Sequence, residues 1–150
     1  MDEPLTLGEA DAVRVGYVSD FYALLRAIDE AMPREAVLCL EGTTVAPDVA
    51  SFLESRQATH RKRVAPNTLW PEPRFFHLAL TGTDLSELRA LAEQHAEPEI
   101  AQHLVVYRDH EVLMWAHDAG MDYVWVSRQL PGSVVEAFRE SLGDALRAER

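Results

Sequence analysis

The stretch HLVVYRDHEVLMWAHDAGMDYVWVS, residues 103–127, decides the fold class of this chain. It contains three apolar runs, at 104–107, 112–116 and 123–127, which are rich in the β-branched and aromatic residues that favour strands. Only short polar segments separate these runs, and connections this short join antiparallel neighbours. The stretch therefore predicts a three-stranded antiparallel meander.

The N-terminal half has a different pattern, in which a strand, a helix and a second strand follow one another. Apolar runs at 13–18 and 36–40 are typical of strands. Between the two runs, apolar side chains recur with the spacing of one helix face, at Phe21, Leu24, Leu25 and Ile28. This order predicts an N-terminal βαβ unit with a parallel crossover.

Three further helices and one further strand complete the expected fold. One helix is predicted to begin at Pro47, and two more are predicted after the capping residues Asp84 and Ser133. The strand is predicted at 74–80. The chain, 1–150, is therefore expected to form a single α/β (α+β) domain with a mixed sheet and about four helices. Two small sheets packed side by side are the alternative.

A long segment at about 57–73 separates the two halves and is expected to be a loop. It contains Pro66, Pro71 and Pro73, and its apolar residues follow neither the helical nor the strand period. Loops of this length are uncommon in compact domains and are often functional. The segment is therefore a candidate contact surface.

Composition restricts the classes of function. The 150 residues include 25 acidic and 14 basic ones, and the resulting net charge of −11 opposes binding to nucleic acid. The single cysteine, Cys39, predicts a reducing compartment. The acidic start and the lack of a long apolar run predict a cytoplasmic protein without a membrane contact. Because glycine-rich phosphate loops and common zinc motifs are missing, we expect no cofactor.

One group of polar residues is a candidate for catalysis. His117 and Asp118, with Asp122 after a glycine, offer an acid, a base and carboxylate ligands. The same residues suit a plain turn, because Asp and Gly are turn formers. Cys39 lies inside an apolar strand, where burial opposes its use as a nucleophile. If the protein has a small catalytic site, we expect it at residues 117–122.

A second group of polar residues is a candidate for metal binding. His95, Glu99 and His103 supply the imidazole and carboxylate ligands that zinc and other divalent metals use. Their spacing matches no standard ligand motif, and Pro98 breaks the helical register between them. A solvated helix end, with His95 near the helix C-terminus, explains the same residues.

Aromatic and basic residues are candidates for binding a partner. Trp70 lies in the proline-containing loop, while Trp115, Tyr123 and Trp125 are placed on neighbouring strands of the meander. Such residues either pack in the core or anchor an interface. The concentrated positive charge of the chain lies at Arg61, Lys62 and Arg63, where it could meet a phosphate, an acidic patch or solvent.

These patterns lead to three hypotheses of function. The first is a non-enzymatic protein-interaction module, of which one version is an immunity or antitoxin-like protein that masks a basic partner. The alternative is a small metal-dependent hydrolase or transferase built on the His117 and Asp118 loop. The third is self-association of the chain as a homo-oligomer through its basic run.

Overall fold

Seven strands form a single sheet in the computed structural model, which describes residues 3–150. The strands are β1 (Ala12–Val18), β2 (Val37–Gly42), β3 (Arg74–Ala79), β4 (His103–Arg108), β5 (Glu111–Ala116), β6 (Asp122–Ser127) and β7 (Leu146–Arg147). Their order is β3-β2-β4-β5-β6-β1-β7, and each neighbouring pair is antiparallel. The predicted meander is confirmed, because β4, β5 and β6 are consecutive neighbours.

The described residues also form four α-helices: α1 (Phe21–Ala31), α2 (Pro47–Ser55), α3 (Asp84–Ala92) and α4 (Gly132–Leu142). Helix α1 begins after Asp20, whose carboxylate accepts hydrogen bonds from the backbone N–H groups of Tyr22 (3.0 Å) and Ala23 (3.2 Å). Pro47 begins α2, where its missing N–H removes no helical hydrogen bond. None of the described helices has both the length and the hydropathy needed to cross a membrane.

The fold class, α/β (α+β) with about four helices, is confirmed, but the expected mixed sheet is wrong. Strands β1 and β2 do run in the same direction on either side of α1, as a βαβ unit requires. They are not neighbours, because the whole meander lies between them. Strands β3 and β4 also run in the same direction around α3, with β2 between them. Every direct pairing is therefore antiparallel, and one continuous sheet excludes two separate sheets.

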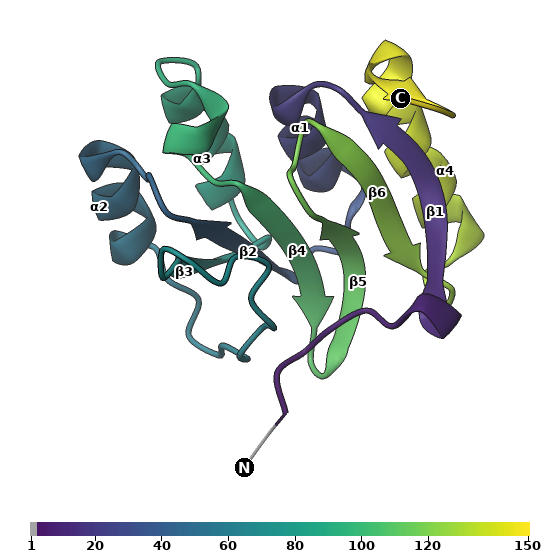
Figure 1. The fold of residues 1–150 in the computed structure, drawn as a ribbon, viewed down its shortest axis with the longest axis horizontal. Coiled ribbons are helices and arrows are strands. Elements are labelled where there is room, and N and C mark those ends of the chain that lie inside the picture. Colours follow the sequence, from purple (N-terminus) through teal and green to yellow (C-terminus); the bar gives the residue numbers. More distant parts are fainter. Residues whose placement is uncertain (1–2) are drawn as a thin grey trace.

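The helices pack in a row on one face of the sheet. Figure 1 shows them in the order α2, α3, α1 and α4, and neighbours in this row contact one another. Their apolar sides and one face of the strands form the main hydrophobic core. Its largest buried side chains include Phe21, Leu24, Leu40, Leu78 and Phe138. Burial of this apolar surface is the main term that stabilises the fold.

The other face of the sheet is covered by two segments without regular structure. Leu5, near the N-terminus, forms a parallel bridge with Val64 of the 57–73 segment. The Leu5 N–H donates to the carbonyl of Arg63, and the Ala65 N–H donates to the carbonyl of Leu5, each at 2.8 Å. Below this pair lies a second, smaller apolar cluster, formed by Cys39, Val64, Val105, Tyr107 and Val112. Polar groups on this face are thereby enclosed by coil.

Candidate functional site

A row of titratable side chains crosses the coil-covered face of the sheet at one end. Glu41 on β2 is paired with His103 on β4, and both side chains point to the face that also carries Val105. Since Leu104 pairs with Ala116, residue 117 follows beside residue 103. The imidazole rings of His103 and His117 stack with centroids 4.6 Å apart and planes inclined by 13°. The register of three strands thus gathers a carboxylate and two imidazoles.

His103 is buried, with 4 % of its surface exposed, and both of its ring nitrogens are hydrogen-bonded. The backbone N–H of Asp118 donates to Nδ1 at 2.9 Å. Nδ1 therefore carries no proton, and Nε2 donates to the hydroxyl of Thr68 at 2.8 Å. Burial is the largest effect and lowers the pKa of His103, while the charge of Glu41 acts in the opposite direction and His117 acts in the same direction as burial. His103 is thus a neutral link between the 117–122 turn and the 57–73 segment.

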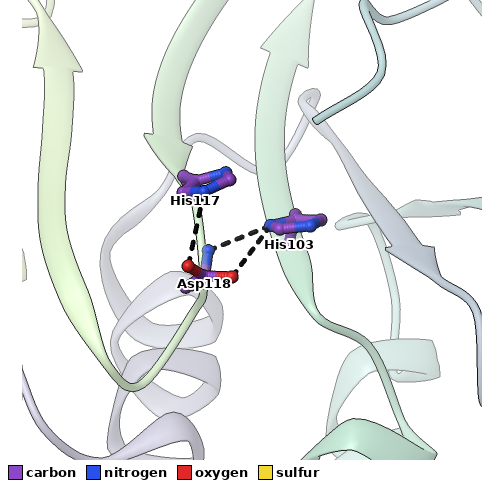
Figure 2. A group of neighbouring side chains, drawn as sticks. All are labelled: His103, His117 and Asp118. Atoms are coloured by element: carbon purple, nitrogen blue, oxygen red, sulfur yellow. Dashed lines mark hydrogen bonds and ion pairs between the residues drawn. The ribbon is translucent and has the colours of Figure 1, made fainter. Parts of the chain in front are cut away.

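His103, His117 and Asp118 are close enough to be considered as metal ligands (Figure 2). Their ligand atoms all lie within 4.8 Å of one another, and residues 3–150 contain no other group of three that meets this criterion. His117 Nε2 lies 3.3 Å from one carboxylate oxygen of Asp118, and His103 Nδ1 lies 3.9 Å from the other. Two imidazoles and a carboxylate are a ligand set that zinc accepts.

The hydrogen bonds of this group oppose a metal. A metal at His103 would have to displace either the Asp118 N–H from Nδ1 or the Thr68 hydroxyl from Nε2. In addition, the ring lone pairs of two stacked imidazoles lie in nearly parallel, separated planes, whereas a shared metal needs them to meet at one point. The observed geometry therefore serves to hold the turn and the loop together.

The turn itself explains the residue types at positions 117–122. Asp118 and Gly120 have positive φ angles, of 48° and 87°. Asp adopts this left-handed conformation more readily than most residues, and Gly adopts it without steric cost. A Cβ atom at Gly120 would lie 2.9 Å from the backbone nitrogen of Phe21, which is closer than a side chain tolerates. Asp122 accepts a hydrogen bond from the N–H of Tyr123 at 2.6 Å and lies outside the group of three.

The other predicted metal ligands lie in a different place. His95 Nε2 contacts Asp48 at 2.9 Å, and its Nδ1 lies 3.8 Å from Glu99. The hydrogen bond to Asp48 raises the pKa of His95. The structure therefore brings His95 and Glu99 together, while His103 belongs to the row on the sheet.

Cys39 is buried in the second apolar cluster, where burial raises the pKa of its thiol and opposes nucleophilic use.

Glu41, which the sequence patterns did not single out, holds the 57–73 segment in place. Only 2 % of its surface is exposed, and its carboxylate accepts hydrogen bonds from three N–H groups. These are the Asn67 backbone (2.9 Å), the Asn67 side-chain amide (2.9 Å) and the Thr68 backbone (2.8 Å). The indole N–H of Trp115 donates to the Asn67 side-chain oxygen at 2.8 Å. Three strands, β2, β4 and β5, therefore fix Asn67 and Thr68.

Leu69 and Trp70, which we call the loop tip, follow directly after these fixed residues. Their exposed fractions are 89 % and 86 %, the largest among the exposed apolar side chains of the described residues. Large apolar side chains are usually buried, and a contiguous patch of exposed ones is typical of a contact surface. The loop tip is therefore an apolar pair presented from a rigid base.

The remaining aromatic candidates lie on the sheet. Trp115 and Trp125 are directly paired across β5 and β6, and they line an open groove of about 610 Å³ together with His117 and Glu9. Tyr123 is engaged in other contacts within the chain. Its ring packs edge-on against Tyr17 and lies under the Arg14 guanidinium, and its hydroxyl donates to Glu149 at 2.9 Å. Trp70 alone among the four projects fully from the surface.

The basic run lies at the opposite end of the loop from the loop tip. Arg61, Lys62 and Arg63 line a cavity of about 340 Å³ beside β3, together with His77. Arg56, just before the run, forms ion pairs with Asp84 (2.8 Å) and Glu87 (2.9 Å) in the first turn of α3, so its charge is already matched within the chain. The structure thus places the three basic candidates around one hollow.

Two histidines are expected to make the fold less stable as the pH falls. Burial holds the pKa of His77 at about 4 and lowers that of His103, whereas an unfolded histidine titrates near pH 6.5. Between about pH 6.5 and 4 the unfolded chain therefore binds more protons, and the free energy of unfolding decreases as the pH decreases. Denaturant unfolding at several pH values measures this slope.

The slope of the free energy of unfolding against pH, between about pH 4 and 6.5, is expected to be smaller in a His77→Gln variant than in the wild-type protein. The matched control is His110→Gln, because His110 is exposed in the turn between β4 and β5. Equal slopes for His77→Gln and the wild-type protein would contradict the assignment of His77 as a histidine buried in its neutral form.

No family model, no curated protein and no solved structure matches the chain.

Proposed function

We propose that this protein is a non-enzymatic interaction module that binds a basic protein partner through the loop tip, Leu69 and Trp70. The observation that carries the proposal is the exposure of both side chains, directly after residues fixed to a buried carboxylate. Tryptophan in particular contributes strongly to binding energy at interfaces. A loop that is already ordered loses less conformational entropy on binding, so more of the contact energy appears as affinity.

Charge supports a basic partner. The chain has a net charge of −11. Two exposed acidic residues lie near the loop tip: Glu72 follows Trp70 in the chain, and Asp118 is linked to Thr68 through His103. Acidic groups around an apolar centre attract a positively charged surface and increase the rate of association. An immunity or antitoxin-like protein in the cytoplasm, covering a basic site of its partner, is one form that this function takes.

Site-specific photocrosslinking tests the proposal. A benzophenone amino acid is placed at position 70 and, as a control, at the exposed position 136 of α4 on the opposite face of the sheet. In cells of the source, position 70 is expected to give a discrete adduct with one basic protein, which position 136 does not give. Adducts of the same identity from both positions, or none from position 70, would show that the loop tip is no contact surface.

A metal-dependent hydrolase or transferase is the second candidate, favoured by the closeness of His103, His117 and Asp118. Zinc titration by calorimetry separates the two candidates. Because both nitrogens of His103 are already hydrogen-bonded, we expect the wild-type protein to bind no stoichiometric zinc. One zinc ion per chain, lost in the His117→Ala variant but kept in His110→Ala, would favour the enzyme instead.

A further inference from the structure

A small cavity with cationic walls lies beside β3 on the coil-covered face, away from the loop tip. Its volume is about 340 Å³, at the lower end of the range for small-molecule sites. The residues that line it are Gln57, Arg61, Lys62, Arg63, Val64, Phe75 and His77. This lining contains basic and amide groups and two apolar side chains, but no carboxylate.

A chain of hydrogen bonds fixes the proton on His77. The backbone N–H of Lys62 donates to the hydroxyl of Tyr107 at 3.1 Å, and this hydroxyl lies 2.8 Å from His77 Nδ1. Within residues 3–150, His77 Nδ1 is the acceptor available to the buried hydroxyl proton, so Tyr107 donates to Nδ1. The ring proton of neutral His77 is therefore on Nε2, and the cavity wall gains an N–H donor.

The side chain of Gln57 adds a second neutral donor to the lining of the cavity. The Gln57 side-chain oxygen accepts a hydrogen bond from the backbone N–H of His77 at 2.7 Å. This bond uses the acceptor of the amide and leaves its NH₂ group as the donor end. Burial and the charge of Arg61 keep His77 neutral at pH 7, since they hold its pKa at about 4. The cavity thus combines neutral N–H donors with the charges of Arg61 and Lys62.

We propose that this cavity binds the phosphate group of a small organic phosphate monoester. Two adjacent cations and neutral N–H donors match a dianion with several acceptor oxygens better than a carboxylate with one charge. Phe75 and Val64 supply an apolar wall for the organic part of the ligand. The net charge of −11 weakens this binding little, because charges more than about 8 Å away are screened at physiological salt.

Phenyl phosphate, titrated into the ¹⁵N-labelled protein at constant ionic strength, tests the proposal. We expect saturable shifts of the Lys62 and His77 signals, and an increase in the pKa of His77 when the anion is bound. Benzoate, which has the same ring with a carboxylate, is expected to bind at least about 10-fold more weakly. Absence of saturation with phenyl phosphate, or equal binding of benzoate, would overturn the proposal.

Charge removal provides the second arm of the test. The Arg61→Ser, Lys62→Ser double variant keeps the Lys62 backbone N–H that bonds Tyr107, and it should bind phenyl phosphate at least about 10-fold more weakly. The control removes the same number of positive charges elsewhere, at Arg26 on α1 and at Arg150, and should bind like the wild-type protein. Equal affinity of the double variant and this control would overturn the assignment of the cavity.

Discussion

Replacing Glu41 with Ala is expected to lower the free energy of unfolding by about 3 kcal/mol. The change leaves the N–H groups of Asn67 and Thr68 without the carboxylate that accepts from them. Buried donors that lose a charged acceptor cost the fold more than the removal of an exposed group. The loss is therefore expected to appear as a lower denaturant midpoint, measured by chemical unfolding at pH 7.

The matched control for this change is Glu54→Ala. Glu54 is exposed and forms an ion pair with Arg74, so its removal is expected to change the free energy of unfolding by less than about 0.5 kcal/mol. A Glu41→Gln variant, which keeps one acceptor oxygen but loses the charge, should fall between the two. If Glu41→Ala and Glu54→Ala were equally stable, the carboxylate of Glu41 would not be holding the loop.

Replacing both residues of the loop tip, Leu69→Ser with Trp70→Ser, is expected to weaken partner binding by at least about 100-fold. Hot-spot residues contribute about 2 kcal/mol or more each, and 1.4 kcal/mol corresponds to a factor of ten. Because both side chains are exposed, the free energy of unfolding is expected to change by less than about 0.5 kcal/mol. Surface plasmon resonance with the crosslinked partner, once purified, measures the affinity.

The control for the loop tip is Val13→Thr, which alters an exposed apolar side chain on β1 and keeps its branched shape. This variant should bind the partner like the wild-type protein. Association with the wild-type protein should slow as salt is added, because the charges that steer the partner become screened. A loop-tip variant that kept full affinity would mean that the contact surface lies elsewhere on the molecule.

Local sequence patterns were sufficient for the elements that depend on neighbours in the chain. The short connections on either side of 112–116 required an antiparallel meander, which β4, β5 and β6 form. The helix predicted from Pro47 onward likewise depends on contacts within a few residues, and Pro47 begins α2. The same logic missed β7, because a strand of two residues, Leu146 and Arg147, is too short to show a period.

Long-range contacts could not be derived in this way. A strand–helix–strand pattern indicates that β1 and β2 run in the same direction, but it does not show whether they are neighbours. The meander lies between them, so each direct pairing is antiparallel and the expected mixed sheet does not form. Glu41 ends an apolar run in the sequence, and nothing local indicates that Asn67, 26 positions later, donates to it. The closeness of His103 and His117, in contrast, follows from the meander register and could have been predicted from it.

The candidate site residues also differ in whether local sequence or long-range contacts explain them. His117, Asp118 and Asp122 were singled out because their types suit a site, and the turn that they form accounts for Asp118 through its positive φ angle. Trp70 was singled out because a large aromatic residue is unusual in a proline-containing loop. Its proposed role in binding depends on whether the loop is ordered. The hydrogen bonds from Asn67 and Thr68 to Glu41 hold the loop in place, and these long-range contacts have no local sequence signal.

Amide hydrogen exchange of Asn67 and Thr68 in the free protein tests most directly whether Leu69 and Trp70 are presented from a fixed base. Both N–H groups donate to buried Glu41, so they are expected to exchange at least about 100-fold more slowly than in an unstructured peptide. Exchange of both amides at the rate of an unstructured peptide would contradict the account, because Leu69 and Trp70 would then lie on a freely moving loop.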